Sequence, residues 1–283
     1  MRITSRMVWT TGPALAMLTV FFVIPLTIII YYSFQSRGVY GGIETAWTLE
    51  NYLNIAKSLY LNILLRSLKL ALLTTVFCAL IGFPVAVAIN NMHGKWQMTA
   101  LMLIILPSWM NLLIKNYAWI VILRRQGLVN TVLLGLGWID QPLELLFNEA
   151  AVLVGLVHNH LPFMVLPIYA VLEKLDVRLI EAARDLGATR WQTFRKVILP
   201  QSWSGVVVGS ILVFVPALGA FLTPDLLGGA NAVMIGNLIQ NQIFTVRDWP
   251  FGSAMAIVLM GVVLLSLVVY ARFGSREGEE RIL

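Results

Sequence analysis

A polar stretch, residues 173–200, separates two apolar stretches of this 283-residue chain, and its residue types suit docking to a soluble partner. Asp176 can accept hydrogen bonds from backbone N–H groups as the N-cap of a short helix, and Gly187 supplies the C-terminal stop. Thr189 and Gln192 then have the spacing of a capping box, which opens a second short helix with one apolar and one basic face. We predict an elbow of two short helices that projects beyond the apolar segments.

A second group of polar residues interrupts the apolar residues 98–123. Polar groups at membrane depth cost free energy and usually face protein or a water-filled cavity, so this group is a candidate translocation path. Its members are Ser108, Trp109, Asn111, Lys115, Asn116 and Tyr117. The alternative is that Asn111 and Lys115 satisfy backbone carbonyls freed near Pro107 or extend to the membrane surface, and the residues alone leave both interpretations open.

Two acidic residues follow apolar stretches in the second half of the chain. Asp225 could guide a cation by Coulomb attraction in a partly desolvated cleft, or cap a short helix that begins at Leu226. It joins the candidate path residues with both interpretations open. For Asp248 the cap is favoured, because Pro250 would occupy an early helical position.

Motifs for catalysis and metal binding are missing from the sequence. No Gly-x-x-x-x-Gly-Lys-Ser/Thr phosphate loop occurs, so we expect no ATP hydrolysis by this chain and no catalytic residue, cofactor or metal of its own. His158 and His160 flank Asn159, but positions two apart on a helix point to different faces, which favours a structural or path-lining role over zinc. No Gly-x-Ser-x-Gly or His-Glu-x-x-His run occurs either.

The composition is that of an integral membrane protein. Of all residues 59% are hydrophobic and 12% charged, whereas soluble domains carry about a quarter charged residues. The single Cys78 implies neither a disulfide framework nor a metal cluster. The net charge of +6 comes from Lys and Arg scattered between apolar stretches, which favours a membrane-topology cause over nucleic acid binding.

Six apolar stretches are long enough to cross a bilayer, for which about twenty residues suffice. We predict one all-α transmembrane domain over residues 1–283, with the elbow between the fourth and fifth spans. The spans cover about residues 8–34, 68–90, 98–123, 150–172, 202–222 and 252–272.

The distribution of basic residues orients these spans. With both termini in the cytoplasm, inside segments hold 12 Lys and Arg residues and outside segments hold 5, as the positive-inside rule requires. Adjacent Arg124 and Arg125 in an outer segment are the exception. The outer segments carry a net charge of −2, which favours the approach of a polycation, although the positive-inside bias alone would produce the same contrast.

The elbow also carries a family resemblance. Glu181-Ala182-Ala183, Gly187 and Val197-Ile198-Leu199-Pro200 have the spacing of the EAA loop of ABC-transporter permease subunits, which usually have isoleucine where Val197 stands. The resemblance implies a type I ABC importer permease fold, in which the first elbow helix is a cytoplasmic coupling helix that inserts into a groove on an ATPase. The alternative is an amphipathic cytoplasmic loop set by charge bias alone. The coupling residues so implied are Glu181, Ala182, Ala183, Arg184, Asp185 and Gly187.

Further runs resemble the spermidine/putrescine (polyamine) importer family, and within it the first of two permease subunits. They are Leu161–Pro167, Asp225–Ala230, Arg247–Gly252 and Pro107–Lys115, although that subunit often has arginine where Lys115 stands. The resemblance implies an importer of the bacterial inner membrane, in contact with lipid and not with nucleic acid. Its parts are a heterodimer of two permeases, two ATPase subunits that bind ATP and Mg²⁺, and an extracytoplasmic binding protein that delivers polyamine.

Other functions fit the residues less well. The same architecture could carry another small organic nitrogen compound, such as an opine or an amino acid derivative. An ion-gradient-driven secondary transporter would need acidic residues deep inside the spans, and none of the 14 acids clearly lies there. A membrane-embedded enzyme is disfavoured by the missing metal and nucleophile motifs.

Overall fold

The computed structural model describes residues 5–279, which fall into two compact units. The first unit comprises Met1–Asn62 and Leu238–Val262, and the second comprises Ile63–Asn237 and Val263–Leu283. The predicted all-α class is confirmed, because within the described residues only two two-residue strands depart from helix and loop. The predicted inside positions of Arg2 and Arg281 lie outside the described residues.

The first unit begins with one long apolar helix. It is built from α1 (Ser5–Leu18), the π-helical turn η1 (Thr19–Val23) and α2 (Ile24–Ser33). Its most apolar part, Thr11–Ser33, is long enough to cross a membrane. This helix is the predicted first span.

A small hairpin and three helical segments complete the first unit. β1 (Ser36–Arg37) pairs antiparallel with β2 (Ile43–Glu44), and α3 (Glu50–Ile55) follows. The later part of α12 (Ile235–Phe244) and the earlier part of α13 (Trp249–Glu279) also belong to this unit. The predicted cap of α13 is confirmed, because the Phe251 N–H donates to Asp248 Oδ1 at 3.0 Å.

The second unit contains the remaining helices, except for the start of the first of them. In chain order they are α4 (Ser58–Asn90), α5 (Lys95–Trp109), α6 (Leu112–Leu123), α7 (Leu128–Gly135), α8 (Glu149–Leu172), α9 (Val177–Asp185), α10 (Arg190–Thr193), η2 (Phe194–Ile198), α11 (Leu199–Leu218), η3 (Pro224–Gly228) and η4 (Gly229–Ala232). The first residues of α4, up to Asn62, belong to the first unit, and the second unit also contains the start of α12 and the part of α13 from Val263. The π-helical turn η3 and the 3₁₀ turn η4 form a short irregular segment after α11.

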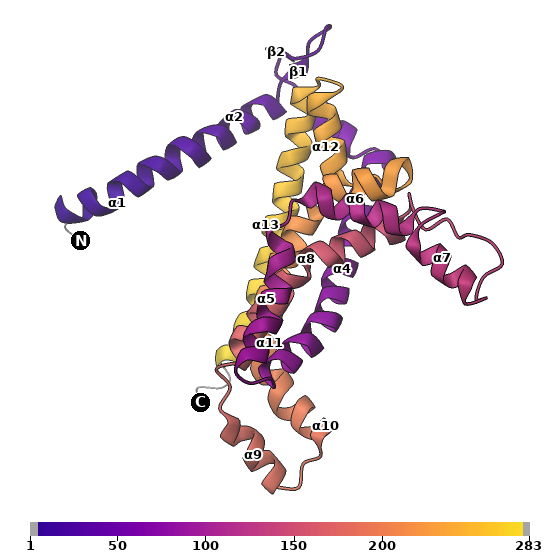
Figure 1. Ribbon diagram of the computed structural model, residues 1–283. Helices are drawn as coiled ribbons and strands as arrows, with labels where there is room; N and C mark the ends of the chain where they lie inside the picture. Colours follow the sequence, from indigo (N-terminus) through magenta and orange to yellow (C-terminus); the bar gives the residue numbers. More distant parts are fainter. Residues whose placement is uncertain (1–4, 280–283) are drawn as a thin grey trace. The chain divides into compact units, whose positions relative to one another are not determined.

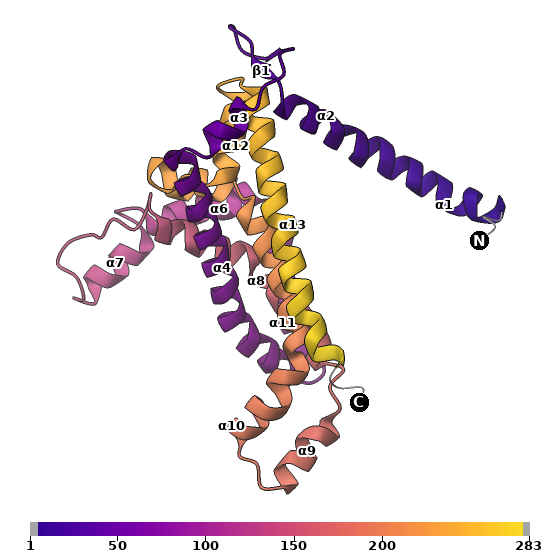
Figure 2. The ribbon, with the colours of Figure 1, turned by 180° about the vertical axis from the view of Figure 1, so that it is seen from behind.

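Helices α8 and α11 lie side by side at the centre of the second unit (Figures 1 and 2). Glycines on α11 permit this close approach. A Cβ atom at Gly205 would lie 2.8 Å from the Pro167 carbonyl oxygen, and one at Gly209 would lie 2.7 Å from Met164 Sδ. Small residues at such contacts are typical of helix packing in membranes, where van der Waals contact drives association.

The described residues hold five or six candidate spans, against the six predicted. Five described helices are long and apolar enough to cross a membrane, and α5 with the Leu112–Gly135 segment makes a sixth span if the bent pair counts as one. The pair bends by 97°, so the predicted third span is a broken helix. The second span begins at Ser58 rather than near residue 68, and the fifth helix begins at Arg190 rather than near residue 202.

Candidate functional site

The elbow is formed by α9, α10 and the turn between them. Asp176 Oδ1 accepts from the Arg178 N–H at 3.0 Å, which confirms the predicted N-cap of α9. Gly187 follows α9 with a φ of +83°, a conformation that L side chains rarely adopt, and its N–H donates to the Arg184 carbonyl at 2.8 Å. The predicted glycine stop is therefore confirmed.

The second elbow helix differs from the prediction. Its capping box is present, because Thr189 Oγ1 accepts from the Gln192 N–H and Gln192 Oε1 accepts from the Thr189 N–H. This helix is not a separate short helix, however. It continues from α10 through η2 into α11 without a break, so that Arg190–Leu218 is one helical segment of 29 residues.

The six residues assigned to coupling all lie on α9 and its C-terminal turn. In Figures 1 and 2 this part lies beyond the ends of α8 and α11. Glu181, Ala182, Arg184 and Asp185 are exposed, and α9 has no buried residue. Three apolar side chains are exposed beside them: Val177, Leu179 and Leu186, the last at 89%. Leu179 and Leu186, seven residues apart, lie on the same side of this helix. Apolar side chains that the described chain leaves uncovered on one side of a helix are typical of a surface that binds another protein.

The candidate path residues cluster at the break between α5 and α6. Trp109 is the last residue of α5 and Tyr117 lies on α6, and the rings of both are exposed. Lys115, two residues before Tyr117 on α6, is half-buried. Asn111 is the N-cap of α6, because its Oδ1 accepts from the Leu113 N–H at 2.8 Å. The predicted alternative, in which Asn111 satisfies a backbone carbonyl freed near Pro107, differs from this contact, which is to a backbone N–H group of α6. The path interpretation of Asn111 stays a prediction.

Asp225 lies in another segment, inside η3. The alternative in which it caps a helix that begins at Leu226 is wrong, because η3 already begins at Pro224 and Asp225 occupies its first turn. Its side chain is exposed and makes no ion pair within the described residues. The Coulomb interpretation of Asp225 stays a prediction.

A buried polar cluster joins α6, α8 and the residue before η3. Asn116, Asn159 and Thr223 are each at most 6% exposed. Asn159 Nδ2 donates to Asn116 Oδ1 at 3.4 Å and to Thr223 Oγ1 at 3.3 Å, and Asn116 Nδ2 donates to Thr223 Oγ1 at 3.2 Å. Sequence reasoning noted Asn116 within a polar run, but it did not connect it to Asn159 or Thr223, which lie on other elements.

The two histidines of α8 have separate surroundings. His160 Nδ1 lies 2.8 Å from the Leu156 carbonyl oxygen, one turn earlier on the same helix. The ring of His158 packs edge-on against Trp119 of α6, with ring centroids 5.7 Å apart. The two rings thus have different contacts on different faces of α8, and both the structural and the path-lining role stay predictions.

One charged cluster fixes the start of α8. Glu149 Oε1 lies 3.1 Å from Arg66 Nε and its Oε2 lies 2.8 Å from Lys69 Nζ, both on α4. Arg66 also donates to the Asn231 carbonyl at 3.1 Å, which links α4 to η4. Sequence analysis did not assign Arg66 and Lys69 a partner, because Glu149 lies about eighty residues further along the chain.

Comparison with known proteins shows the class of protein to which the chain belongs. Residues 72–277 match the family described as "Binding-protein-dependent transport system inner membrane component". The chain belongs to this family of inner-membrane transport components, and it has the multi-pass, apolar helices that such a component needs.

Two curated relatives and two solved structures show which members of this class the chain is similar to. The chain is 43% identical over 255 residues to the spermidine/putrescine transport system permease protein PotB of Escherichia coli (strain K12). The aligned residues make up 90% of this chain and 93% of that protein. It is 42% identical over 254 residues to the PotB protein of Haemophilus influenzae, which covers 89% of each. A bacterial alginate ABC transporter shares the fold with a TM-score of 0.80 at 17% identity, over 96% of both chains. A structure of a bacterial alginate ABC transporter in complex with an alginate pentasaccharide-bound periplasmic protein gives a TM-score of 0.77, also at 17% identity, over 97% of this chain and 98% of that one.

Proposed function

We propose that this chain is one of two permease subunits of an ATP-driven importer for polyamines such as spermidine and putrescine. The observation that carries the proposal is the 43% identity over 90% of the chain to a spermidine/putrescine permease. An extracytoplasmic binding protein delivers the cargo, and the second permease completes the path as a heterodimer. Both termini and the elbow face the cytoplasm of a bacterial cell, as the distribution of basic residues favours.

The elbow transmits movement from a separate ATPase. The sequence has no phosphate loop, so two partner ATPase subunits bind ATP and Mg²⁺. The residues from Glu181 to Gly187 insert into the ATPase surface, and the exposed apolar side chains of α9 supply contact area there. Closure of the ATPase dimer moves α9 as a rigid body. Because α10 continues into α11, the fifth span tilts with it, and the translocation path between the two permeases changes the side of the membrane to which it opens.

The path for the cargo passes the break between α5 and α6. The exposed rings of Trp109 and Tyr117 offer faces that attract ammonium groups by cation–π interaction. Asn111 and Asp225 add polar contacts, and Asp225 adds negative charge. Lys115 has the opposite effect, since its ammonium group repels a polycation and shortens its residence. Such a balance suits transport, because a cargo must bind well enough to enter and weakly enough to leave.

Transport by the reconstituted importer tests this proposal. The chain is assembled with its second permease and ATPase in proteoliposomes, and the cognate binding protein is added outside with radiolabelled putrescine, spermidine or an amino acid. We expect uptake of polyamine to exceed uptake of the amino acid at equal concentration. Uptake of an amino acid or an opine with no uptake of polyamine would contradict the assignment of cargo and leave the importer architecture intact.

A further inference from the structure

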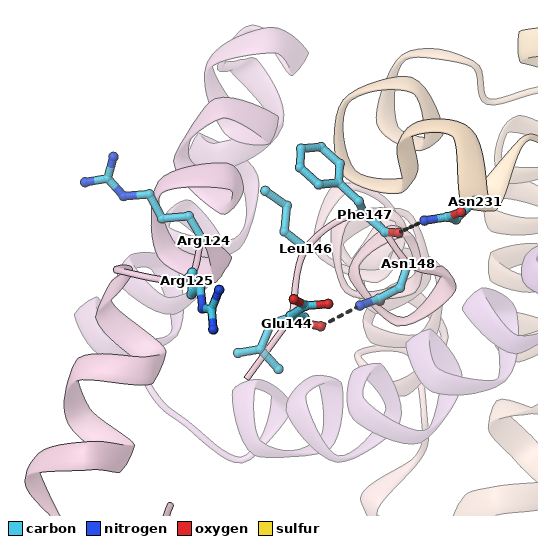
Figure 3. Close-up of a pocket in the computed structure, with 8 residues that line it drawn as sticks. Arg124, Arg125, Glu144, Leu146, Phe147, Asn148 and Asn231 are labelled. Atoms are coloured by element: carbon cyan, nitrogen blue, oxygen red, sulfur yellow. Dashed lines mark hydrogen bonds between the residues drawn. The ribbon is translucent and has the colours of Figure 1, made fainter. Parts of the chain in front are cut away.

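The arginine pair that breaks the charge bias lies at the rim of a cavity. Arg124 and Arg125 follow α6 directly, and they line a cavity of about 560 Å³ together with the segment before α8. Figure 3 shows the two arginines on one side of the cavity and Glu144, Phe147 and Asn148 on the other. The candidate path and the elbow do not include any of these residues.

The wall that carries the arginines is tightly held. The Gly127 N–H donates to the Arg124 carbonyl at 2.7 Å, and a Cβ atom at Gly127 would lie 2.8 Å from that oxygen, so only glycine closes this turn. Asn130 is 1% exposed, and its Nδ2 donates to the Arg125 carbonyl at 3.2 Å and to the Leu143 carbonyl at 2.9 Å. A single buried amide therefore fixes both edges of the cavity.

The opposite wall is equally constrained. Phe147 has a φ of +60°, which is uncommon for a residue with a side chain, and its N–H donates to the Leu227 carbonyl at 2.9 Å. Asn231 Nδ2 donates to the Phe147 carbonyl at 3.1 Å, and Arg66 holds the Asn231 carbonyl in turn. Backbone held in a sparsely populated conformation by several hydrogen bonds is a frequent property of binding sites.

The charges of the cavity are unbalanced. Arg124 and Arg125 are exposed, and neither makes an ion pair within the described residues. Glu144 is also exposed and unpaired there, which leaves an excess of one positive charge. Figure 3 shows the Arg125 side chain directed toward the Glu144 side of the cavity and the Arg124 side chain directed away from it. A guanidinium group presents a planar set of donors that matches a carboxylate, so Arg125 favours direct contact with an acidic side chain, and Arg124 adds positive charge at the rim.

We propose that this cavity receives an acidic side chain of the extracytoplasmic binding protein and orients that protein on the permease. The inference rests on the proposed function, which supplies the partner and the side of the membrane. Protein is favoured over lipid because the cavity combines arginines with a 52% exposed Phe147 ring and asparagine amides. Arginine and aromatic residues are enriched at protein–protein contacts.

The dissociation constant of the binding protein tests the inference. The complete importer in nanodiscs is immobilised, and the binding protein is titrated at 50 and 300 mM NaCl with Arg124→Glu, Arg125→Glu and the milder Arg125→Gln. We expect charge reversal to raise Kd about tenfold at low salt and to reduce the salt dependence. Lys57→Glu is the matched control, because it makes the same charge change at an exposed outer residue that does not line the cavity. Glu144→Gln should lower Kd, since it removes a carboxylate that repels the incoming one.

The outcomes separate this inference from the proposed function. An unchanged Kd in both charge-reversal variants, or an equal rise in Lys57→Glu, would overturn the docking role. A loss of co-purified anionic lipid from the charge-reversal variants, with no change in their Kd, would also overturn the docking role. If the binding protein does not bind even the unaltered importer, the proposed function itself fails. Size-exclusion chromatography shows whether each complex assembles. If a charge reversal prevents assembly, the milder Arg125→Gln still tests the docking role.

Discussion

Asn159 on α8 donates a hydrogen bond to Asn116 on α6 at 3.4 Å, although 43 residues separate them in the sequence. Thr223 completes the cluster, and four hydrogen bonds connect the three residues. Asn159 Oδ1 is buried, and no described residue gives it a hydrogen bond. The cluster joins α8, the helix that leads to the elbow, to α6 on the candidate path.

The cluster predicts unequal costs for two similar substitutions. Asn116 takes part in three of the four hydrogen bonds, whereas Asn159 takes part in two and already has an unsatisfied oxygen. We expect Asn116→Leu to lower the free energy of unfolding by about 1–3 kcal/mol, because partners remain buried and unpaired, and Asn159→Leu to cost less. Thermal unfolding of the purified complexes checks the order. An equal or greater loss for Asn159→Leu would contradict the assigned bonding.

The Glu149 cluster predicts a small and salt-dependent stabilisation. Arg66, Lys69 and Glu149 side chains are 38%, 60% and 35% exposed, so solvent screens their ion pairs. Glu149→Gln should lower stability by about 0.5–1 kcal/mol at low salt and by less at 1 M NaCl. Glu144→Gln makes the same charge change without an ion pair in the described chain and serves as the control. A loss that is independent of salt would point to packing instead.

The turn after α9 predicts loss of coupling in one glycine variant. Gly187→Val places a β-branched side chain at a φ of +83°, which costs about 1–3 kcal/mol of local strain. We expect ATP hydrolysis to continue while polyamine uptake falls, since α9 would no longer move as one body with α10. Gly135→Val is the matched control, because that glycine has no positive φ and open space around its Cβ position. Wild-type ratios of uptake to hydrolysis in Gly187→Val would argue against the elbow as the coupling element.

The charge of Asp225 predicts a change in apparent affinity. Its exposed carboxylate has no ion-pair partner among the described residues, so its attraction remains available to a cationic cargo. Asp225→Asn should raise the KM for spermidine uptake several-fold, by about 1 kcal/mol of lost attraction, with a smaller effect on putrescine, which has fewer charges. Asp140→Asn, at another exposed acidic residue, should leave the KM unchanged. Equal effects of the two substitutions would indicate a general surface field.

The features that could be predicted from the sequence, the spans and the helix caps, are those set by residues close together in the chain. Spans follow from apolar runs of sufficient length, and the caps at Asp176, Thr189 and Asp248 follow from spacings of two or three residues. Pro107 and Asn111 marked the third span as interrupted. The 97° bend itself was not predictable, because packing against other elements sets the direction in which α6 leaves the break.

Relationships between distant residues could not be predicted in the same way. Thr223 and Asn116 are separated by 107 residues, and nothing in either local sequence indicates the other. The continuity of α10 with α11 could not be predicted, because a proline such as Pro200 usually ends or kinks a helix. In the structure the π-helical turn η2 lies immediately before Leu199 and Pro200, and its changed hydrogen-bond pattern lets the helix continue through a residue without an N–H group.

The central claim, that a separate ATPase drives transport through this chain, is tested most directly by the dependence of uptake on the nucleotide bound to that ATPase. Spermidine uptake is measured in proteoliposomes that hold the whole importer with Mg-ATP enclosed, with ADP enclosed, or with a partner ATPase made unable to hydrolyse ATP. We expect uptake in the first case alone. Undiminished uptake by this chain without nucleotide and without its ATPase would contradict the claim that a separate ATPase drives transport.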